Sequence, residues 1–157
     1  MNAVARLPWL LEPRRPGGAI LAGWLAATLP SLLLAMLVGY FLPRVAAPNV
    51  PVGGLIPFLL VVIFSPVVET LIMAVAIEIG LLMLPPVAAV ILSSIGWGIA
   101  HSLAAPAWGL VIWWPFLIFS TLYVTWRGEG RALALAIVAT VHALNNLGPA
   151  LLLLRSA

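Results

Sequence analysis

A nearly unbroken apolar stretch, residues 53–84, carries a single acidic residue, Glu69, at its middle. As a helix, about 20 residues are enough to cross the roughly 30 Å hydrocarbon core of a bilayer. An acidic side chain at the centre of a membrane helix costs on the order of 2.5–3.5 kcal/mol on insertion scales, so such residues usually face the protein interior and mark function. The sequence therefore predicts a membrane helix whose Glu69 has polar partners elsewhere in the chain.

The composition is that of a chain embedded mostly in a bilayer. Of its 157 residues, 64% are hydrophobic and 7% are charged, whereas soluble domains carry about 25% charged residues. The absence of Cys, Lys and Asp excludes disulfides, a thiol nucleophile, a Ser–Lys dyad and an aspartyl dyad. The net charge of +3 comes from Arg and Glu, without the basic patch interleaved with aromatic residues that nucleic-acid binding favours.

Five apolar segments predict an all-α fold, a polytopic transmembrane helical bundle. The predicted helices are residues 19–42, 56–84, 87–105, 107–126 and 132–154. We expect a break in the second helix at Pro66, because proline removes a backbone hydrogen bond. Residues 1–16 are predicted to be a cytoplasmic segment, and residues 17–157 a single membrane-embedded domain with its core at 56–154.

The arginines predict the orientation of the bundle. With the N-terminus in the cytoplasm, five Arg lie inside and two outside, as the positive-inside rule favours. The five are Arg6, Arg14, Arg15, Arg127 and Arg131. We interpret the chain as an integral membrane protein of a bacterial inner membrane, surrounded by lipid and without a nucleic-acid partner.

Three polar residues in the predicted spans are candidate partners of Glu69: His101, His142 and Asn146. His142 and Asn146 are four residues apart and share a helix face, whereas Asn145 points elsewhere. Each group alone has an ordinary structural explanation: a protonated Glu, a neutral His bonded to a carbonyl, or an interhelical hydrogen bond worth about 0.6 kcal/mol. Four such groups on three spans, in a chain nearly free of other polar groups, indicate a site.

Other conspicuous residues are predicted to lie at the membrane surface. Glu78 is nine residues beyond Glu69, about half a turn around the helix, and closer to the cytoplasmic end. We expect it at the interface, because charges near helix ends reach the headgroup region. Four Trp towards the ends of the fourth predicted helix are expected to be interface anchors. They are Trp108, Trp113, Trp114 and Trp126.

Several hydrolytic mechanisms could use these groups. The HExxH signature of zinc proteases is absent, but a zinc ion held by Glu69, His101 and His142 is an alternative, with no ligand role for Asn146. A serine route through Ser94 is weaker, because about 10 Å of helix rise separates Ser94 from His101, which leaves His142 on the fifth predicted helix as its only base. Water activation employs all four groups. The Glu, oriented by the first His, takes a proton from water, and the second His and the Asn donate to the oxyanion.

Three segments resemble the motifs of a known family. They are SPVVETLIMA (65–74), WGIAH (97–101) and HALNN (142–146). In order and spacing they are similar to the Glu-Glu-x-x-x-Arg, Phe-x-x-x-His and His-x-x-x-Asn motifs of the CPBP family. This family comprises the CAAX proteases and bacteriocin-processing enzymes, also called glutamic intramembrane proteases. The resemblance covers about residues 56–150.

The resemblance implies a metal-independent glutamic intramembrane protease without a cofactor. It implies that Glu69 is the general base and that His101 helps to activate water. It implies that His142 and Asn146 stabilise the oxyanion. The implied partner is a peptide or protein substrate in or at the membrane, such as a prenylated protein or a leader peptide.

The first two motifs depart from the family pattern at three positions. Thr70 stands for the second Glu, Ala74 for the Arg and Trp97 for the Phe. The joint loss of Glu and Arg supports an alternative function, a catalytically inactive CPBP-like adaptor or immunity protein. A less favoured alternative is a transporter that uses the same groups as a proton relay.

The predicted helix limits also imply an offset in depth. His101 lies about four residues from the outer end of its helix, whereas Glu69 and His142 lie about twelve residues from theirs. At 1.5 Å of rise per residue, this places His101 roughly 12 Å from the depth of the other two.

Overall fold

The structure, a computed structural model, describes residues 15–46 and 53–155. The described residues form helices and no strand. In chain order the helices are α1 (Pro16–Phe41), α2 (Leu55–Leu59), η2 (Leu60–Phe64), α3 (Ser65–Gly80), α4 (Pro86–Ala104), α5 (Pro106–Trp126) and α6 (Arg131–Arg155). The short π-helix η2 joins α2 to α3, so that residues 55–80 form one continuous run. Within the described part, five helical segments are long and apolar enough to cross a membrane. The predicted all-α, five-span architecture is confirmed.

Proline marks the start of three long helices. Pro16, Pro86 and Pro106 occupy the first helical position of α1, α4 and α5, where the missing N–H would have had no intrahelical partner. The helical run before the second of these prolines ends at Gly80, four residues earlier than predicted, because glycine weakens a helix and the Pro85–Pro86 pair cannot continue it. The predicted cytoplasmic segment lies outside the described residues except for its last two.

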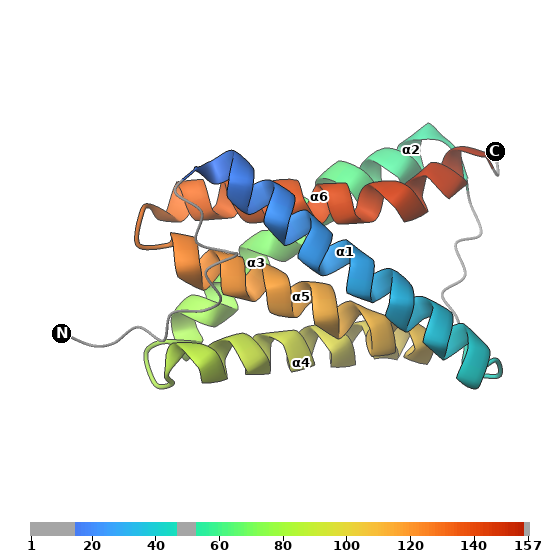
Figure 1. Ribbon diagram of the computed structural model, residues 1–157, viewed down its shortest axis with the longest axis horizontal. Coiled ribbons are helices and arrows are strands. Elements are labelled where there is room, and N and C mark those ends of the chain that lie inside the picture. The colour runs from blue at the N-terminus through green and yellow to red at the C-terminus, as the bar shows by residue number, and fades with distance from the viewer. Residues whose placement is uncertain (1–14, 47–52, 156–157) are drawn as a thin grey trace.

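The helix α5 lies at the centre of the bundle, between α1, α4 and α6 (Figure 1). Half of its apolar span is buried, the largest share of the five spans. The core combines large side chains of α5 with others from α3 and α6. They include Phe116, Phe119, Leu122, Tyr123, Met73, Ile77, Val138 and Val141. Large apolar side chains on the outer helix faces are exposed, as expected for surfaces that lipid covers.

Small residues bring α4 close to α5. A Cβ on Gly109 would overlap Ser102 and the Gly98 carbonyl, and a Cβ on Gly98 would lie 3.0 Å from Cβ of Trp113. Both glycines are therefore required by the packing, since close backbone approach between membrane helices needs small residues. This contact fixes the end of α4 that carries His101.

The run α2–η2–α3 crosses the bundle obliquely (Figure 1). Its first part, α2 and η2, packs on α6, whereas α3 also reaches α4 and α5. The same number of residues therefore covers a shorter distance along the bundle axis in this run than in α4. The oblique path brings the middle of α3 between α4 and α6, where the candidate site lies.

One end of the bundle gathers the start of α1, the α3–α4 connection and the α5–α6 connection (Figure 1). Here the Glu78 carboxylate accepts hydrogen bonds from Tyr123, Arg127 and Arg131. Arg127 binds it in a fork, with Nε 2.9 Å from Oε1 and Nη2 2.8 Å from Oε2. Glu78 thus lies near a helix end, as predicted, and links α3 to α5 and α6.

Candidate functional site

The structure brings Glu69, His101 and His142 together from α3, α4 and α6. Oε2 of Glu69 lies 4.0 Å from Nε2 of His101 and 3.7 Å from Nε2 of His142. The three side chains meet although the predicted helix limits offset His101 from the other two, and the oblique path of α3 across the bundle accounts for the position of Glu69 (Figure 1). Both separations exceed a direct hydrogen bond, and each can be bridged by one small polar group.

The two oxygens of Glu69 have different surroundings. Oε1 accepts a hydrogen bond from the hydroxyl of Ser65, one turn earlier on α3, whereas Oε2 faces the two imidazoles. The side chain is 21% exposed, so the carboxylate is neither sealed in the core nor open on the surface. Ser65 holds the carboxylate by one oxygen and leaves the other directed at the two His.

His101 is held in a defined tautomer by its own helix. Its Nδ1 lies 2.9 Å from the carbonyl oxygen of Trp97. A carbonyl only accepts hydrogen bonds, so Nδ1 carries a proton, and in the neutral ring Nε2 presents its lone pair to Glu69. The ring also contacts Trp97, Trp108 and Phe116, with centroids 5.0–5.7 Å apart. Trp108 therefore packs on the candidate site, a contact beyond its predicted interface role.

His142 is buried among the aromatic residues of α5, with 3% of its surface exposed. Its ring lies against Phe119 at 4.6 Å and edge-on to Phe116 at 5.3 Å between centroids. Nδ1 has no hydrogen-bond partner among the described residues. Because a buried unpaired N–H is rarer than an unpaired acceptor, the favoured tautomer places the proton on Nε2. The ring then directs an N–H donor at the Oε2 side of Glu69.

Asn146 is not joined to the other three predicted site residues by a described contact. Its side-chain amide donates to the backbone carbonyl of Val61 in η2, at 3.1 Å. The neighbouring Asn145 accepts a hydrogen bond from Thr28 of α1 at 3.1 Å, so the two amides point to different helices, as predicted. The predicted oxyanion role of Asn146 therefore competes with a structural use of one of its two amide protons.

Two of the three positions that depart from the motif pattern are buried. Thr70 is 1% exposed and Ala74 is 5% exposed, and both face the core rather than Glu69. The hydroxyl of Thr70 has no hydrogen-bond partner among the described residues. A second carboxylate and a guanidinium would need space that this packed core does not provide. Small side chains therefore stand at the two positions where the motif has a polar pair.

The structure also bears on Ser94, the weaker nucleophile candidate, and on the Trp side chains predicted to lie at the membrane interface. The hydroxyl of Ser94 is buried and donates to the Ile91 carbonyl of its own helix, so it has a backbone partner instead of a His. Among the interface Trp, Trp126 is buried in the core cluster with 7% exposed, and Trp114 donates to the Ala26 carbonyl of α1. Trp126 is therefore a core residue at the end of α5 rather than an interface anchor, whereas Trp114 lies in the middle of α5 and is partly buried, and its anchor role stays a prediction.

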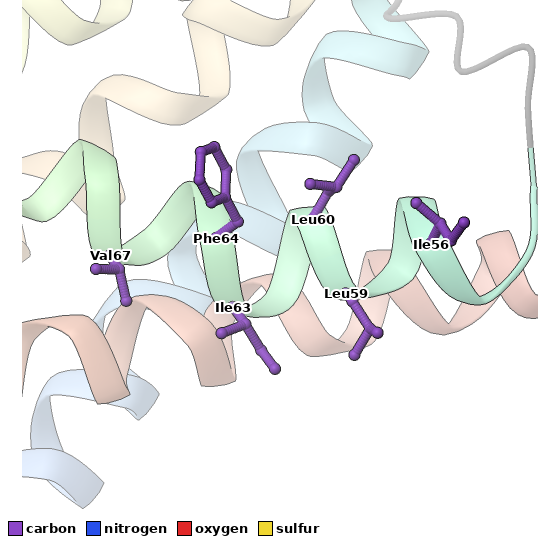
Figure 2. A pocket seen from close by; sticks show the side chains of 6 residues that line it. All are labelled: Ile56, Leu59, Leu60, Ile63, Phe64 and Val67. Carbon is purple, nitrogen blue, oxygen red and sulfur yellow. The ribbon is translucent and has the colours of Figure 1, made fainter.

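Glu69, His101 and His142 lie close together, but in the described ranges no group of three or more His, Cys, Asp or Glu side chains has an arrangement that could hold a metal ion. An open apolar hollow of about 400 Å³ lies on the outer face of α2–η2–α3 (Figure 2). The six side chains around it are all apolar: Ile56, Leu59, Leu60, Ile63, Phe64 and Val67. None of the predicted site residues lines this hollow, and its walls are between 41% and 73% exposed. We assign it to the lipid-facing surface.

Two residues of the site were missed in the sequence. Ser65 had a usable signal, because it precedes Glu69 by one helical turn and therefore shares its face. Phe116 had none, since it is one aromatic among many apolar residues of α5. Its ring nevertheless contacts both imidazoles and stacks on Trp97 with centroids 4.3 Å apart.

Comparison of the chain with protein-family models, with curated proteins and with solved structures finds no match. The chemistry of the site is inferred from its own geometry.

Proposed function

We propose that the chain is an intramembrane endopeptidase, which hydrolyses a peptide bond of a membrane-associated substrate with a water molecule activated by Glu69 and His101. One observation carries the proposal: a single carboxylate oxygen faces the Nε2 atoms of two imidazoles at 3.7 and 4.0 Å. A water about 2.8 Å from each of two groups fits such separations.

The proton positions support water activation. A Glu69 carboxylate only accepts hydrogen bonds, and so does Nε2 of a His101 whose Nδ1 donates to Trp97. A water between these two acceptors donates both of its protons and directs a lone pair outwards. As the oxygen attacks the substrate carbonyl, one proton passes to Glu69, which later delivers it to the departing amine. The C–N bond breaks as the amine takes this proton, and the second proton of the water stays on the new carboxyl group.

His142 is the proposed oxyanion donor. Its favoured tautomer directs Nε2–H to the region that the attacked carbonyl would occupy next to the water. One such donor contributes roughly 2.7–4 kcal/mol to lowering the barrier of acyl transfer. The aromatic rings of Phe116 and Phe119 around this imidazole exclude water and thereby strengthen the interaction.

The substrate is proposed to be a peptide or protein at the membrane, either prenylated or a leader peptide, as the resemblance to CAAX and bacteriocin-processing proteases implies. We place the N-terminus in the cytoplasm of a bacterial cell, by the distribution of Arg. Arg127 and Arg131 lie at the end of the bundle where α1 begins (Figure 1), which agrees with a common cytoplasmic side.

The test uses proteoliposomes that contain the protein and a panel of labelled peptides, each anchored by one transmembrane helix or one isoprenyl group. Replacing Glu69 by Gln keeps the shape and removes the base, and we expect cleavage to fall by about 10²–10⁴-fold. Cleavage in ¹⁸O-labelled water should place the label in the new carboxylate. Retention of more than a tenth of the rate in Glu69→Gln would contradict the role of Glu69.

One observation favours a second candidate, the inactive adaptor. The positions of the second Glu and the Arg of the CPBP motif are packed in the core as Thr70 and Ala74, so two polar groups of the motif that the chain resembles are absent. For an adaptor, no peptide of the panel is cleaved, and Glu69→Gln leaves partner binding intact. Metal analysis and a chelator control separate both candidates from a zinc hydrolase.

A further inference from the structure

The π-helical turn before Glu69 leaves one backbone carbonyl without its usual donor. In a π-helix each N–H donates to the carbonyl five residues back, as the N–H of Ser65 does to the Leu60 carbonyl. The Val61 carbonyl has two possible donors in its own helix: the N–H of Ser65, four residues on, which Leu60 engages, and the N–H of residue 66, five residues on. Residue 66 is Pro66, which has no N–H. The Val61 carbonyl therefore needs a donor from outside its own helix.

We infer that Asn146 is a positioning residue, whose side-chain amide replaces the N–H that Pro66 lacks and so holds the π-helical turn that leads into Glu69. Asn146 donates to the Val61 carbonyl at 3.1 Å, across the contact between α6 and η2. In apolar surroundings an unpaired carbonyl is costly, and a proline in a membrane helix is tolerated where a neighbouring helix restores the missing bond.

The turn matters because it sets the register of α3. A π turn contains one more residue than an α turn, so it rotates the preceding segment by about 100° relative to Ser65 and Glu69. If the turn relaxed to an α-helix, the N–H of Ser65 would move from the Leu60 carbonyl to that of Val61. The amide of Asn146 occupies the Val61 carbonyl and disfavours this exchange.

The same face of α6 therefore contacts the α2–η2–α3 run twice. His142 lies 3.7 Å from the Glu69 carboxylate, and Asn146, one turn further, bonds the segment that precedes Glu69. Residues four apart on a helix share a face, which gives the His-x-x-x-Asn spacing a geometric reason. This reason holds whether or not the site hydrolyses peptides.

The test is a double-mutant cycle on the full-length protein in detergent micelles. Asn146→Leu keeps the side-chain volume but cannot donate, and we expect the unfolding midpoint to fall by roughly 3–10 °C. Pro66→Ala returns an N–H to the backbone, so that adding Asn146→Leu to the Pro66→Ala variant should cost less than half as much. Equal costs in the two backgrounds would overturn the inference.

Asn145→Leu is the matched control. Its amide bonds Thr28 on α1, so its cost should be the same with and without the Pro66→Ala substitution. Amide hydrogen exchange measures the local stability of residues 55–69 and can be carried out on the single variants. Asn146→Leu should speed amide exchange within residues 55–69, and Asn145→Leu should not. Faster exchange spread evenly over the five spans, or no change in residues 55–69, would reject a positioning role.

A second measurement reports on the position of the Glu69 carboxylate. The chain contains two His, so the ¹⁵N imidazole spectrum reports on the two rings that face Glu69. Asn146→Leu should shift the Nε2 resonances of both, because the turn that carries Glu69 loses its tether. Unchanged resonances would show that Asn146 does not place Glu69. Neither the hydrogen-exchange measurement nor the imidazole spectrum requires a substrate. If the protein does not hydrolyse peptides, the positioning role of Asn146 can still hold, and if Asn146 has no such role, hydrolysis can still occur.

Discussion

The two described glutamates of α3, Glu69 and Glu78, differ in how their charges are compensated. Glu78 accepts four hydrogen bonds, from Tyr123, Arg127 and Arg131, all between 2.8 and 3.1 Å. Glu69 accepts one from Ser65, and its other oxygen stands 3.7 and 4.0 Å from two imidazoles. The first carboxylate is saturated, whereas the second has capacity for a further partner.

The difference separates a carboxylate that stabilises the fold from one that is available for chemistry. A carboxylate has about four acceptor sites, and Glu78 has used them to bind α3 to α5 and α6. A general base needs an oxygen that is free to take a proton, which only Glu69 retains. Both residues lie on one helix, so the helix itself does not decide their roles.

After the loss of the base in Glu69→Gln, the largest expected effect concerns the hydrogen-bond donors next to the two carboxylates. His142→Asn removes the N–H at the Nε2 position and should lower kcat by about 10²–10³-fold with KM little changed, because the lost bond forms in the transition state. His142→Gln places an amide N–H near Nε2 and should recover part of the rate. The measurement is cleavage of an anchored peptide in proteoliposomes.

The control for this prediction lies at the other glutamate. Tyr123→Phe removes one donor from Glu78 and should leave the rate per folded molecule within about twofold, since that donor serves the fold. A comparable loss of rate in both variants would mean that the two carboxylates do not have separate roles.

An intermediate effect is expected on the free energy of unfolding. Here the substitution of Glu78 should matter more than the substitution of Glu69. Glu78→Gln weakens the charge-assisted bonds from Arg127 and should cost about 1–3 kcal/mol of unfolding free energy. Glu69→Gln should leave that free energy unchanged or raise it, because a neutral amide is less costly than a carboxylate in an apolar site. Denaturation in mixed micelles, followed by circular dichroism, measures both. If Glu69→Gln were the more destabilising, Glu69 would be a structural residue.

The sequence was sufficient for the architecture because the bilayer imposes it. Span length, Pro at helix starts and the turn residues between spans place each helix within a few residues, and Gly80 caused the largest error. These signals are local, so they need no knowledge of packing.

The site was predictable only in part. The motif spacing named Glu69, His101 and His142, and the structure places them together. The oblique path of α3 was not predictable, because crossing angles depend on contacts between distant segments. The same is true of the π-helical turn, whose carbonyl takes the amide of Asn146, since Pro66 indicates a break but not its form.

The smallest expected effect distinguishes the two Arg bound to Glu78. The Arg127 side chain is 34% exposed and bidentate, whereas Arg131 is 69% exposed and donates a single bond at 3.1 Å. Arg131→Ala should therefore cost about 0.2–1 kcal/mol, less than Arg127→Ala, and its cost should shrink further in 1 M salt because exposed pairs are screened. The midpoints of both variants at low and high salt measure the difference. If Arg131→Ala cost more unfolding free energy than Arg127→Ala, the exposed Arg131 would be the more important donor to the Glu78 carboxylate. Glu78 and Glu69 would then differ in solvent access rather than in the number of hydrogen bonds that they accept.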